Sequence, residues 1–313
     1  MGTTPTKSHM ILSLNCAKGE SSTYAVLSFV SRNPHYIALL LQEPWLNSNR
    51  EPPSLAGFDL FIPTPTDPKC VTYIHKSAHL KPSLALNEAD CFLGVKLRVS
   101  APTSTSTSSS STSPSFTLYN LYSPRRQQAI YHFFNRFNPT TNAIICGDFN
   151  SHHRTWYGHR ATQHTAHLMN DARLAEGLVE RLVNLSLVLR NDPGVYTHYP
   201  RNGASPSIID LTFTRGQPNE DVLDWSLGDD FGSDHLSTHL HFASGVAETA
   251  CGLAWSKADW GKFAAVLDRA GLDFDSLKSK EEIERATENY ARVLHNAIEG
   301  EVPKIQSNSR RKA

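Results

Sequence analysis

Short apolar runs bounded by turn-forming residues recur along the first 245 positions and alternate with segments of helical periodicity. Runs of about four to eight apolar residues are typical of buried β-strands. We therefore expect strands at Ile11–Leu14, Tyr36–Leu41, Cys70–Ile74, Phe92–Val99, Phe116–Tyr122, Ala143–Cys146, Ile208–Thr214 and Leu236–Phe242.

Helical periodicity appears between these runs, at Ser21–Ser31, at Gln127–Phe137 and most clearly from about Ala166 to Leu185. In the last segment, apolar residues recur at steps of three and four, which places them on one helical face. The members of this stripe are Leu168, Ala172, Ala175, Val179 and Leu182. Strands and helices mixed in this way predict a domain of the α/β or α+β class.

Residues 101–115 are almost entirely Ser and Thr. Such a segment has nothing to bury, so we expect a disordered loop. The runs on either side then form two strands of an expanded hairpin, because a long surface loop costs little stability. A linker between two domains is the alternative, which we disfavour because residues suited to catalysis fall on both sides.

The pattern changes after about residue 245. Ser256 with Asp259, and Ser279 with Glu282, have the spacing of helix capping boxes. Each pair precedes an amphipathic stripe, the first ending at Gly271 and the second near Gly300. The stripes comprise Trp260, Phe263, Val266 and Leu267, then Ile283, Ala286, Tyr290, Val293 and Ala297. We expect one domain over residues 1–245 and a helical extension with a basic tail over 246–313.

Composition narrows the class of protein. The 313 residues are 39% hydrophobic, enough for a sizeable core, and no apolar run reaches the length of a membrane span. The N-terminus lacks the apolar stretch of a signal peptide, and the odd, widely spaced cysteines predict buried thiols in a reducing compartment. We expect a nuclear or cytoplasmic protein that is not secreted. The formal net charge of zero counts mildly against a nucleic-acid partner, although it leaves room for a local basic groove.

Polar side chains stand at or near the ends of five predicted strands, where a fold can hold reactive groups rigidly beside a cleft. The stretches are Leu14-Asn15, Gln42-Glu43-Pro44, Gly147-Asp148-Phe149-Asn150, Ile209-Asp210-Leu211 and Ser233-Asp234-His235. Carboxylates suit Mg²⁺, amides can donate to phosphate oxygens, and an imidazole beside a carboxylate can manage protons near neutral pH. This set fits metal-assisted phosphodiester hydrolysis better than acyl transfer.

Each stretch alone has an ordinary structural explanation. Gly, Asp and Asn favour turns, so Asn15 and the Gly-Asp-Phe-Asn run can simply end strands. Asp210 is the harder case, because a carboxylate within an apolar run is costly unless it is hydrogen-bonded. The number and the order of the stretches favour a common site.

These stretches, with Tyr122-Ser123-Pro124, occur in an order that resembles the endonuclease/exonuclease/phosphatase superfamily, which includes apurinic endonucleases and DNase I-like enzymes. The resemblance spans residues 10–242. Finer features are similar to LINE-type (non-LTR) retrotransposon endonuclease domains, namely "LNCAKG", "LLLQEPW", "GDFNSHHRTWYG" and "SIIDLTF". The "WSKADWGKF" segment is also similar to the region after the nuclease in those polyproteins.

The resemblance implies a DNase I-like four-layer fold, a two-sheet β-sandwich flanked by helices, with the site at one edge. It implies Glu43 as the main ligand of Mg²⁺, with Mn²⁺ as a possible substitute, and Asn15 and Asp234 in support. Among the catalytic residues it implies, Asp148 positions or deprotonates the attacking water, and Asn150 and Tyr122 bind the scissile phosphate. His235 would stabilise the pentacovalent phosphorus, with its ring oriented by Asp210.

The implied activity is Mg²⁺-dependent nicking of double-stranded DNA that leaves a 3′-hydroxyl, which in retrotransposons primes reverse transcription. No membrane and no obligate protein partner are expected. Two alternatives stay open: a phosphatase of the same fold that acts on small phosphorylated substrates, and a non-catalytic, domesticated DNA-binding remnant. Repair-type members carry an acid where this chain has Ala17, which argues against strong abasic-site activity and leaves any second metal in doubt.

Other polar groups are less specific. Arg125, Arg126 and Arg154 flank the expected site and can contact DNA phosphates, but ordinary surface charge explains them equally well. His164 and His167 have a spacing that permits a zinc site, which we disfavour for lack of further ligands at suitable spacing.

Overall fold

The structure is a computed structural model of the 313-residue chain. It describes residues 8–63, 67–76, 80–87, 91–99, 115–124, 130, 133–134, 137, 142–160, 172–216, 222–243, 252–253, 258–269, 271, 279–302 and 304–305. The chain divides into two compact units, residues 1–246 and 247–313. The expected loop at 101–115 lies outside the described residues, apart from Ser115.

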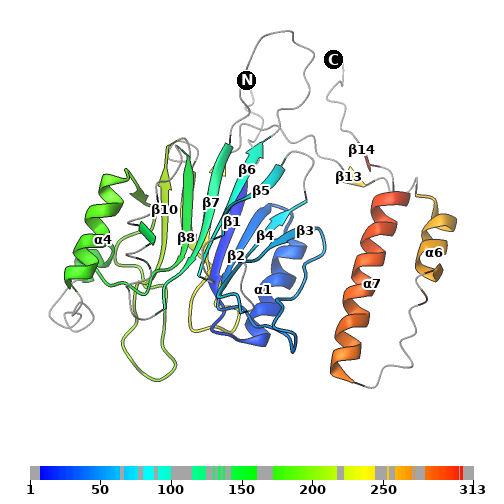
Figure 1. The fold of residues 1–313 in the computed structure, drawn as a ribbon, viewed down its shortest axis with the longest axis horizontal. Coiled ribbons are helices and arrows are strands. Elements are labelled where there is room, and N and C mark those ends of the chain that lie inside the picture. The colour runs from blue at the N-terminus through cyan, green and yellow to red at the C-terminus, as the bar shows by residue number, and fades with distance from the viewer. Residues whose placement is uncertain are drawn as a thin grey trace, which may run out of the picture. The chain divides into compact units, whose positions relative to one another are not determined.

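Two six-stranded sheets form the first unit (Figure 1). Sheet 1 has the order β11-β12-β1-β2-β4-β3, and sheet 2 has the order β5-β6-β7-β8-β10-β9. In sheet 1 the strands are β1 (Ser8–Asn15), β2 (Tyr36–Gln42), β3 (Phe58–Phe61), β4 (Cys70–His75), β11 (Val222–Leu227) and β12 (Thr238–Ala243). In sheet 2 they are β5 (Leu80–Asn87), β6 (Phe92–Val99), β7 (Ser115–Tyr122), β8 (Ala143–Asp148), β9 (Val188–Leu189) and β10 (Asp210–Arg215).

Each sheet is mixed in the same way. The central pairs, β1 with β2 and β7 with β8, are parallel, while the other neighbours run antiparallel. A parallel pair needs a crossover connection, and helix α1 (Glu20–Arg32) provides it between β1 and β2. The antiparallel pairing of β6 with β7 confirms the hairpin expected on either side of residues 101–115.

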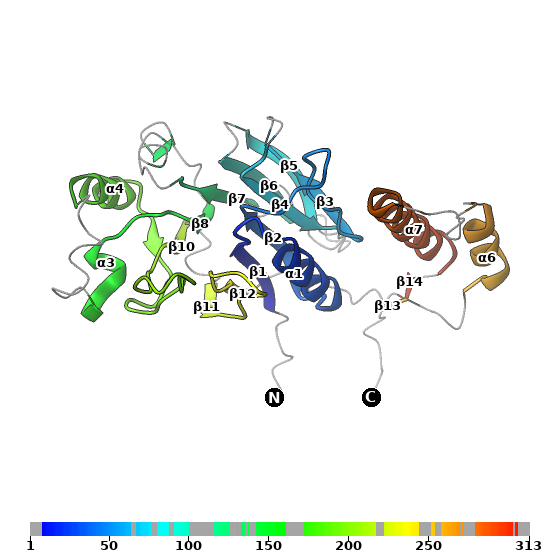
Figure 2. The same ribbon diagram turned by 90° about the horizontal axis from the view of Figure 1, so that it is seen from below.

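Both faces of each sheet are covered, which explains the continuous apolar runs. In β2, Ala38 and Leu40 face sheet 2, while Leu39 and Leu41 pack on the outer side with Val26 and other α1 residues. Successive side chains of a strand point to opposite faces, so a strand buried on both faces has no polar side. The result is a four-layer sandwich in which α1 covers sheet 1 (Figure 2).

Helix α4 (Ala172–Asn184) covers the outer face of sheet 2, and its Ala175, Leu178 and Leu182 are buried. The first part of the helix expected from Ala166 lies outside the described residues. The short helices α3 (Arg154–Tyr157) and η1 (Gly158–Arg160) follow β8. Together these elements confirm the expected two-sheet sandwich flanked by helices.

A polar contact also joins the sheets inside the apolar core. Asn120 on β7 donates from Nδ2 to the carbonyl oxygens of Leu41 (3.1 Å) and Val71 (2.7 Å), both in sheet 1. Its Oδ1 accepts from Gln42 Nε2 at 2.7 Å. Burying an amide is costly unless it is hydrogen-bonded, and here both ends of the amide are satisfied.

Four cysteines, Cys16, Cys70, Cys91 and Cys146, are buried free thiols, as expected, and Cys251 lies outside the described residues. No helix within the described residues is long and apolar enough to span a membrane.

The second unit contains α6 (Trp260–Arg269), α7 (Lys280–Glu301) and a short pair of strands, β13 (Gly252–Leu253) with β14 (Lys304–Ile305). Ser279 and Glu282 form the predicted capping box at the start of α7. Ser256, of the other predicted box, lies outside the described residues. Helix α6 begins at Trp260, directly after Asp259. Asp259 Oδ1 accepts from the backbone N–H of Lys262 at 3.1 Å. An Asp immediately before a helix satisfies a free N–H of the first turn.

One buried histidine gives the first unit a testable dependence on pH. His239 accepts at Nδ1 from the Tyr36 hydroxyl (2.8 Å), and its Nε2 lies 2.9 Å from Ser237 Oγ, which itself donates to the Asp229 carbonyl. These contacts suit a neutral ring protonated at Nε2. Burial, with a smaller effect from His241, lowers the pKa of His239 to about 4, although the Asp229 carboxylate acts in the opposite direction.

We predict that His239 destabilises the fold in mild acid. Its folded pKa lies below the unfolded value, so between these pKa values the unfolded chain binds the proton more readily. From pH 7 to pH 5 this one group should remove about 2 kcal/mol from the free energy of unfolding. Urea denaturation at both pH values should show that this part of the loss disappears in His239→Gln. An equal loss in both proteins would contradict the assignment.

Candidate active site

Three polar side chains lie next to one another at the ends of adjacent strands in sheet 2. The register pairs Tyr122 of β7 with Asp148 of β8, and Asp148 with Asp210 of β10. Residues directly opposite each other on neighbouring strands point to the same face of the sheet. The strand ends therefore hold a hydroxyl and two carboxylates in a row.

Sheet 1 supplies the other half of the site. Asn15 and Gln42 are partners at the ends of the parallel strands β1 and β2, and Glu43 follows directly. Asn15 Nδ2 donates to Asp148 Oδ2 at 2.9 Å, although 133 positions separate the two residues. This hydrogen bond joins the two sheets at the same edge.

Asp148 is almost completely buried, yet both of its oxygens accept hydrogen bonds. Besides the bond from Asn15, Asn150 donates to it from its backbone N–H (2.9 Å) and from Nδ2 (3.0 Å). Burial, with the nearby Asp210 carboxylate, raises the pKa of Asp148 to about 7, whereas His235 and these donors act in the opposite direction. A carboxyl group with a pKa near neutrality is suited to exchange a proton with water.

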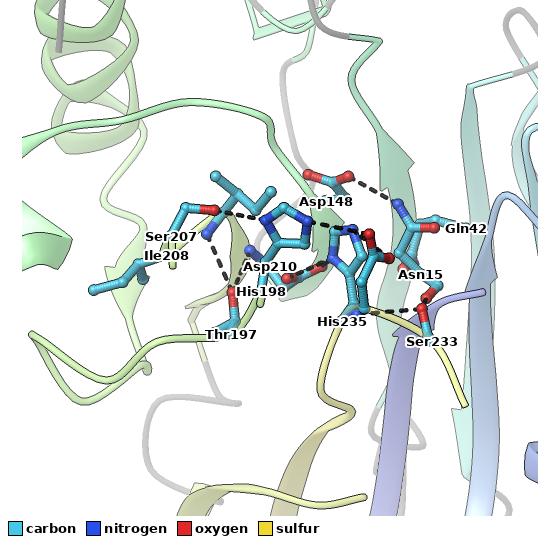
Figure 3. Close-up of polar contacts among 12 residues, drawn as sticks. Asn15, Gln42, Asp148, Thr197, His198, Ser207, Ile208, Asp210, Ser233 and His235 are labelled. Carbon is cyan, nitrogen blue, oxygen red and sulfur yellow. Dashed lines mark hydrogen bonds and ion pairs between the residues drawn. The ribbon is translucent and has the colours of Figure 1, made fainter. Parts of the chain in front are cut away.

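His235 and Asp210 form the second buried pair (Figure 3). His235 Nδ1 lies 2.9 Å and 3.0 Å from the two carboxylate oxygens of Asp210. Burial by itself lowers the pKa of His235, but Asp210, Asp148 and Asp234 outweigh it and raise this pKa to about 9. The contact with Asp210 fixes a proton on Nδ1 and leaves Nε2 as the ring atom available to a ligand.

The Ser-Asp-His stretch is tied to the end of β1. Ser233 Oγ donates to the Asn15 carbonyl at 2.6 Å and accepts the backbone N–H of His235 at 3.2 Å. A short hydroxyl side chain can satisfy neighbouring backbone groups in this way and fix the course of a loop. Ser233 therefore holds the His235 loop against Asn15.

Glu43 stands beside this cluster, with its side chain 19% exposed and its Oε1 3.2 Å from Lys18 Nζ. Its backbone has a φ of 41°, and its N–H donates to the Lys69 carbonyl at 2.8 Å. Burial raises the pKa of Tyr122, and the Glu43 and Asp148 carboxylates and a hydrogen bond with Glu43 raise it further. Tyr122 thus lies close to both carboxylates and links Glu43 to the rest of the cluster.

Six residues singled out from the sequence are joined in this cluster, either directly or through Tyr122: Asn15, Glu43, Tyr122, Asp148, Asp210 and His235. Asn150 and Asp234 adjoin it, the first through Asp148 and the second 4.0 Å from His235 Nε2. Arg154 is exposed and pairs with Glu176 at 3.6 Å. Arg125, Arg126, His164 and His167 lie outside the described residues.

Sequence reasoning missed His198. Its ring centroid lies 4.4 Å from that of His235, and its Nδ1 lies 2.8 Å from Ser207 Oγ. The residue sits in an irregular segment before β10, joined to Ser207 and His235 by isolated β-bridges. No apolar run precedes it, so nothing in the pattern marks it as the end of a strand.

The donor set fits a hard divalent cation. Glu43 offers a partly exposed carboxylate, and Asn15 Oδ1, which accepts from the Ala17 N–H at 2.9 Å, keeps a second lone pair. Asp234 Oδ1 is buried without a hydrogen-bond partner among the described residues. Mg²⁺ binds through one or two carboxylates together with waters and phosphate. The few protein ligands offered here are therefore enough for Mg²⁺.

The backbone conformation of the Gly-Asp-Phe-Asn run explains why Gly and Asn occupy its first and last positions. Gly147 has a φ of 151°, and a Cβ placed on it would lie 1.8 Å from the Leu121 carbonyl oxygen. Two residues after Asp148, Asn150 has a φ of 43°, a conformation that Asn tolerates better than most residues. Glycine therefore allows β8 to pass close to β7 just before Asp148.

We predict that Gly147→Ala strongly destabilises the fold, because the added methyl would meet the Leu121 carbonyl. The expected loss in the free energy of unfolding is about 3 kcal/mol or more. Gly203→Ala is the matched control, since Gly203 also has a positive φ (76°) but a Cβ added to it would meet nothing within 4 Å. The control should cost about 1 kcal/mol. Similar losses for both variants in urea denaturation would contradict the prediction.

Comparisons with known proteins agree with this geometry. Residues 116–239 match the family model described as "Endonuclease-reverse transcriptase". No curated protein matches the chain. One similar solved structure is the endonuclease domain of TRAS1, a telomere-specific non-LTR retrotransposon, with 18% identity, a TM-score of 0.57 and coverage of 76% of this chain and 99% of that one.

Two apurinic (AP) endonucleases are also similar. LMAP from Leishmania major has 15% identity and a TM-score of 0.59, with coverage of 77% of this chain and 90% of that one. The enzyme from Archaeoglobus fulgidus has 14% identity and a TM-score of 0.51, with coverage of 75% and 100%. The chain therefore has the fold of retrotransposon and AP endonucleases. These matches confirm the resemblance that the motifs indicated.

Proposed function

We propose that this chain is a Mg²⁺-dependent endonuclease that nicks double-stranded DNA and leaves a 3′-hydroxyl. The observation that carries the proposal is the convergence of Asn15, Asp148, Asp210 and His235, brought by both sheets to one edge and joined by hydrogen bonds. The likeness to retrotransposon and AP endonucleases supports the same class of reaction.

Glu43 would hold the metal ion, with Asn15 Oδ1 and Asp234 in support. A bound Mg²⁺ would neutralise charge on the phosphate and orient it for attack. The remaining chemistry belongs to side chains of this protein. Water is a poor nucleophile, and a carboxylate with a pKa near 7, such as Asp148, can take a proton from it as its oxygen attacks the phosphorus. The P–O3′ bond would then break, and the leaving oxygen would take a proton from solvent to become the 3′-hydroxyl.

His235 and Tyr122 would stabilise charge on the phosphate. Because Asp210 anchors Nδ1, the Nε2–H of protonated His235 can donate to a phosphate oxygen that gains charge. The raised pKa keeps the Tyr122 hydroxyl protonated, and its one proton is hydrogen-bonded with Glu43. It would turn to the phosphate once Glu43 holds the metal ion. Each donor fixed in advance stabilises the transition state without reorganisation.

The contacts refine the role of Asn150. Its Nδ2 donates to the Ser123 carbonyl at 2.7 Å and to Asp148 Oδ2 at 3.0 Å. An amide nitrogen has two hydrogens, so a hydrogen bond to phosphate would have to replace one of these. We therefore assign Asn150 first to positioning Asp148, and to phosphate binding only after a shift of its amide.

We predict that the purified chain converts supercoiled plasmid to nicked circles with Mg²⁺, and that EDTA abolishes this. Glu43→Ala and His235→Ala should each lower the nicking rate by about 100-fold or more, because each removes a group that acts on the metal or the phosphate. His241→Gln, on β12, is the matched histidine control. A DNA ligase should reseal the nicks without end treatment if they carry a 3′-hydroxyl and a 5′-phosphate.

Other outcomes separate the alternatives. Release of inorganic phosphate from small phosphorylated compounds, without nicks, would identify a phosphatase of the same fold. DNA binding without cleavage under any divalent ion would identify a non-catalytic remnant. Nicking that survives both substitutions would show that the activity comes from a contaminant or from another site.

A further inference from the structure

His198, Asp234 and His235 form a compact group of possible metal ligands. His198 Nε2 lies 3.5 Å from Asp234 Oδ2, and His235 Nε2 lies 4.0 Å from Asp234 Oδ1. One ligand atom from each residue can be chosen so that all three lie within 4.8 Å of one another. The two nitrogen–oxygen distances exceed those of good hydrogen bonds. They are close to the separation of about 3.4 Å between two ligands that bind one tetrahedral ion at about 2.1 Å.

Both imidazole rings are oriented by a partner at the opposite nitrogen. His235 Nδ1 contacts the Asp210 carboxylate at 2.9 Å, and His198 Nδ1 contacts Ser207 Oγ at 2.8 Å. In each ring this leaves Nε2 directed toward Asp234. Metal-binding histidines in proteins have the same arrangement, with the other ring nitrogen donating to a carboxylate, a carbonyl or another oxygen.

The Asp234 carboxylate, which both Nε2 atoms approach, is not fully hydrogen-bonded within the described part of the chain. Asp234 Oδ1 is buried and has no hydrogen-bond partner among the described residues. A buried carboxylate oxygen without a partner is costly, so this atom favours a cation or a donor from a ligand. The neighbouring Asp210 adds negative charge on the far side of His235.

We propose that His198 Nε2, Asp234 and His235 Nε2 form a second divalent cation site that selects Zn²⁺ over Mg²⁺. Two nitrogens and one oxygen suit a borderline ion such as Zn²⁺, while Mg²⁺ prefers oxygen ligands. Three protein ligands leave one position for water. The proposed Mg²⁺ site is centred on Glu43, so the two sites differ in ligand type and share only Asp234.

Occupancy by zinc has a consequence for the proposed nuclease. The ion would take His235 Nε2, the atom assigned above to the phosphate, and would withdraw Asp234 from the magnesium site. Zn²⁺ should therefore inhibit nicking at constant Mg²⁺. This consequence alone rests on the proposed function, whereas the binding of zinc does not.

The test is calorimetric titration of the full chain with Zn²⁺ in the presence of excess Mg²⁺. His198→Gln, which removes a ligand, should weaken binding by at least about tenfold, because even the loss of an outer-shell partner costs about 10–100-fold. Ser207→Ala keeps every ligand but removes the oxygen that orients His198, and it should weaken binding by roughly tenfold. His241→Gln, with circular dichroism to verify folding, should bind like the wild type.

The outcomes are distinct. Zinc binding that survives in His198→Gln but is lost in a His164→Gln/His167→Gln double variant would place the ion at residues 164–167. The proposal would then be wrong. Absence of binding, or binding that is equal in wild type and His198→Gln, also overturns it. If zinc binds as predicted while the wild type nicks no DNA, the zinc site stands and the proposed function fails.

Discussion

The site depends on one hydrogen bond, from the Asn15 amide to the Asp148 carboxylate, because it directly joins a polar group of each sheet at this edge. Packing between sheets is strong but has no direction, so it does not by itself fix which polar groups face each other. Asn15 holds Asp148 from one side and, through its carbonyl, anchors Ser233 and the His235 loop on the other. One residue at the end of β1 thus sets the position of both the proposed base and the histidine.

The interior strands of the two sheets could be predicted from the sequence, and the edge strands could not. Every predicted strand corresponds to a strand inside one of the two large sheets, and the four strands of these sheets that were missed are the edges: β3, β5, β9 and β11. Interior strands are buried on both faces and produce unbroken apolar runs, of which β2 is the clearest example. Edge strands carry less of this signal, and β5 even contains Pro82, which an edge tolerates.

The same limit applies to the site. Asn15, Glu43, Asp148 and Asp210 were visible because each interrupts or follows an apolar run, and their order matched a known family. His198 comes from an irregular segment, and its place beside His235 depends on backbone bridges that no local pattern encodes. The ion pair of Lys18 with Glu43 was equally beyond local rules, because 25 positions separate the two residues.

Asn120 contributes to both the alignment of the two sheets and the stability of the core. Its amide contacts backbone of β2 and β4, beneath the edge that carries the candidate site, and so fixes the position of one sheet against the other. An apolar residue of similar size would fill the same space and keep the domain folded, yet it would let the sheets slide by small amounts. Loss of the Asn120 amide would also remove a partner from the buried Gln42 amide, so it would lower stability and let the two halves of the candidate site move apart. A residue that touches none of the candidate catalytic groups can thus decide whether they meet.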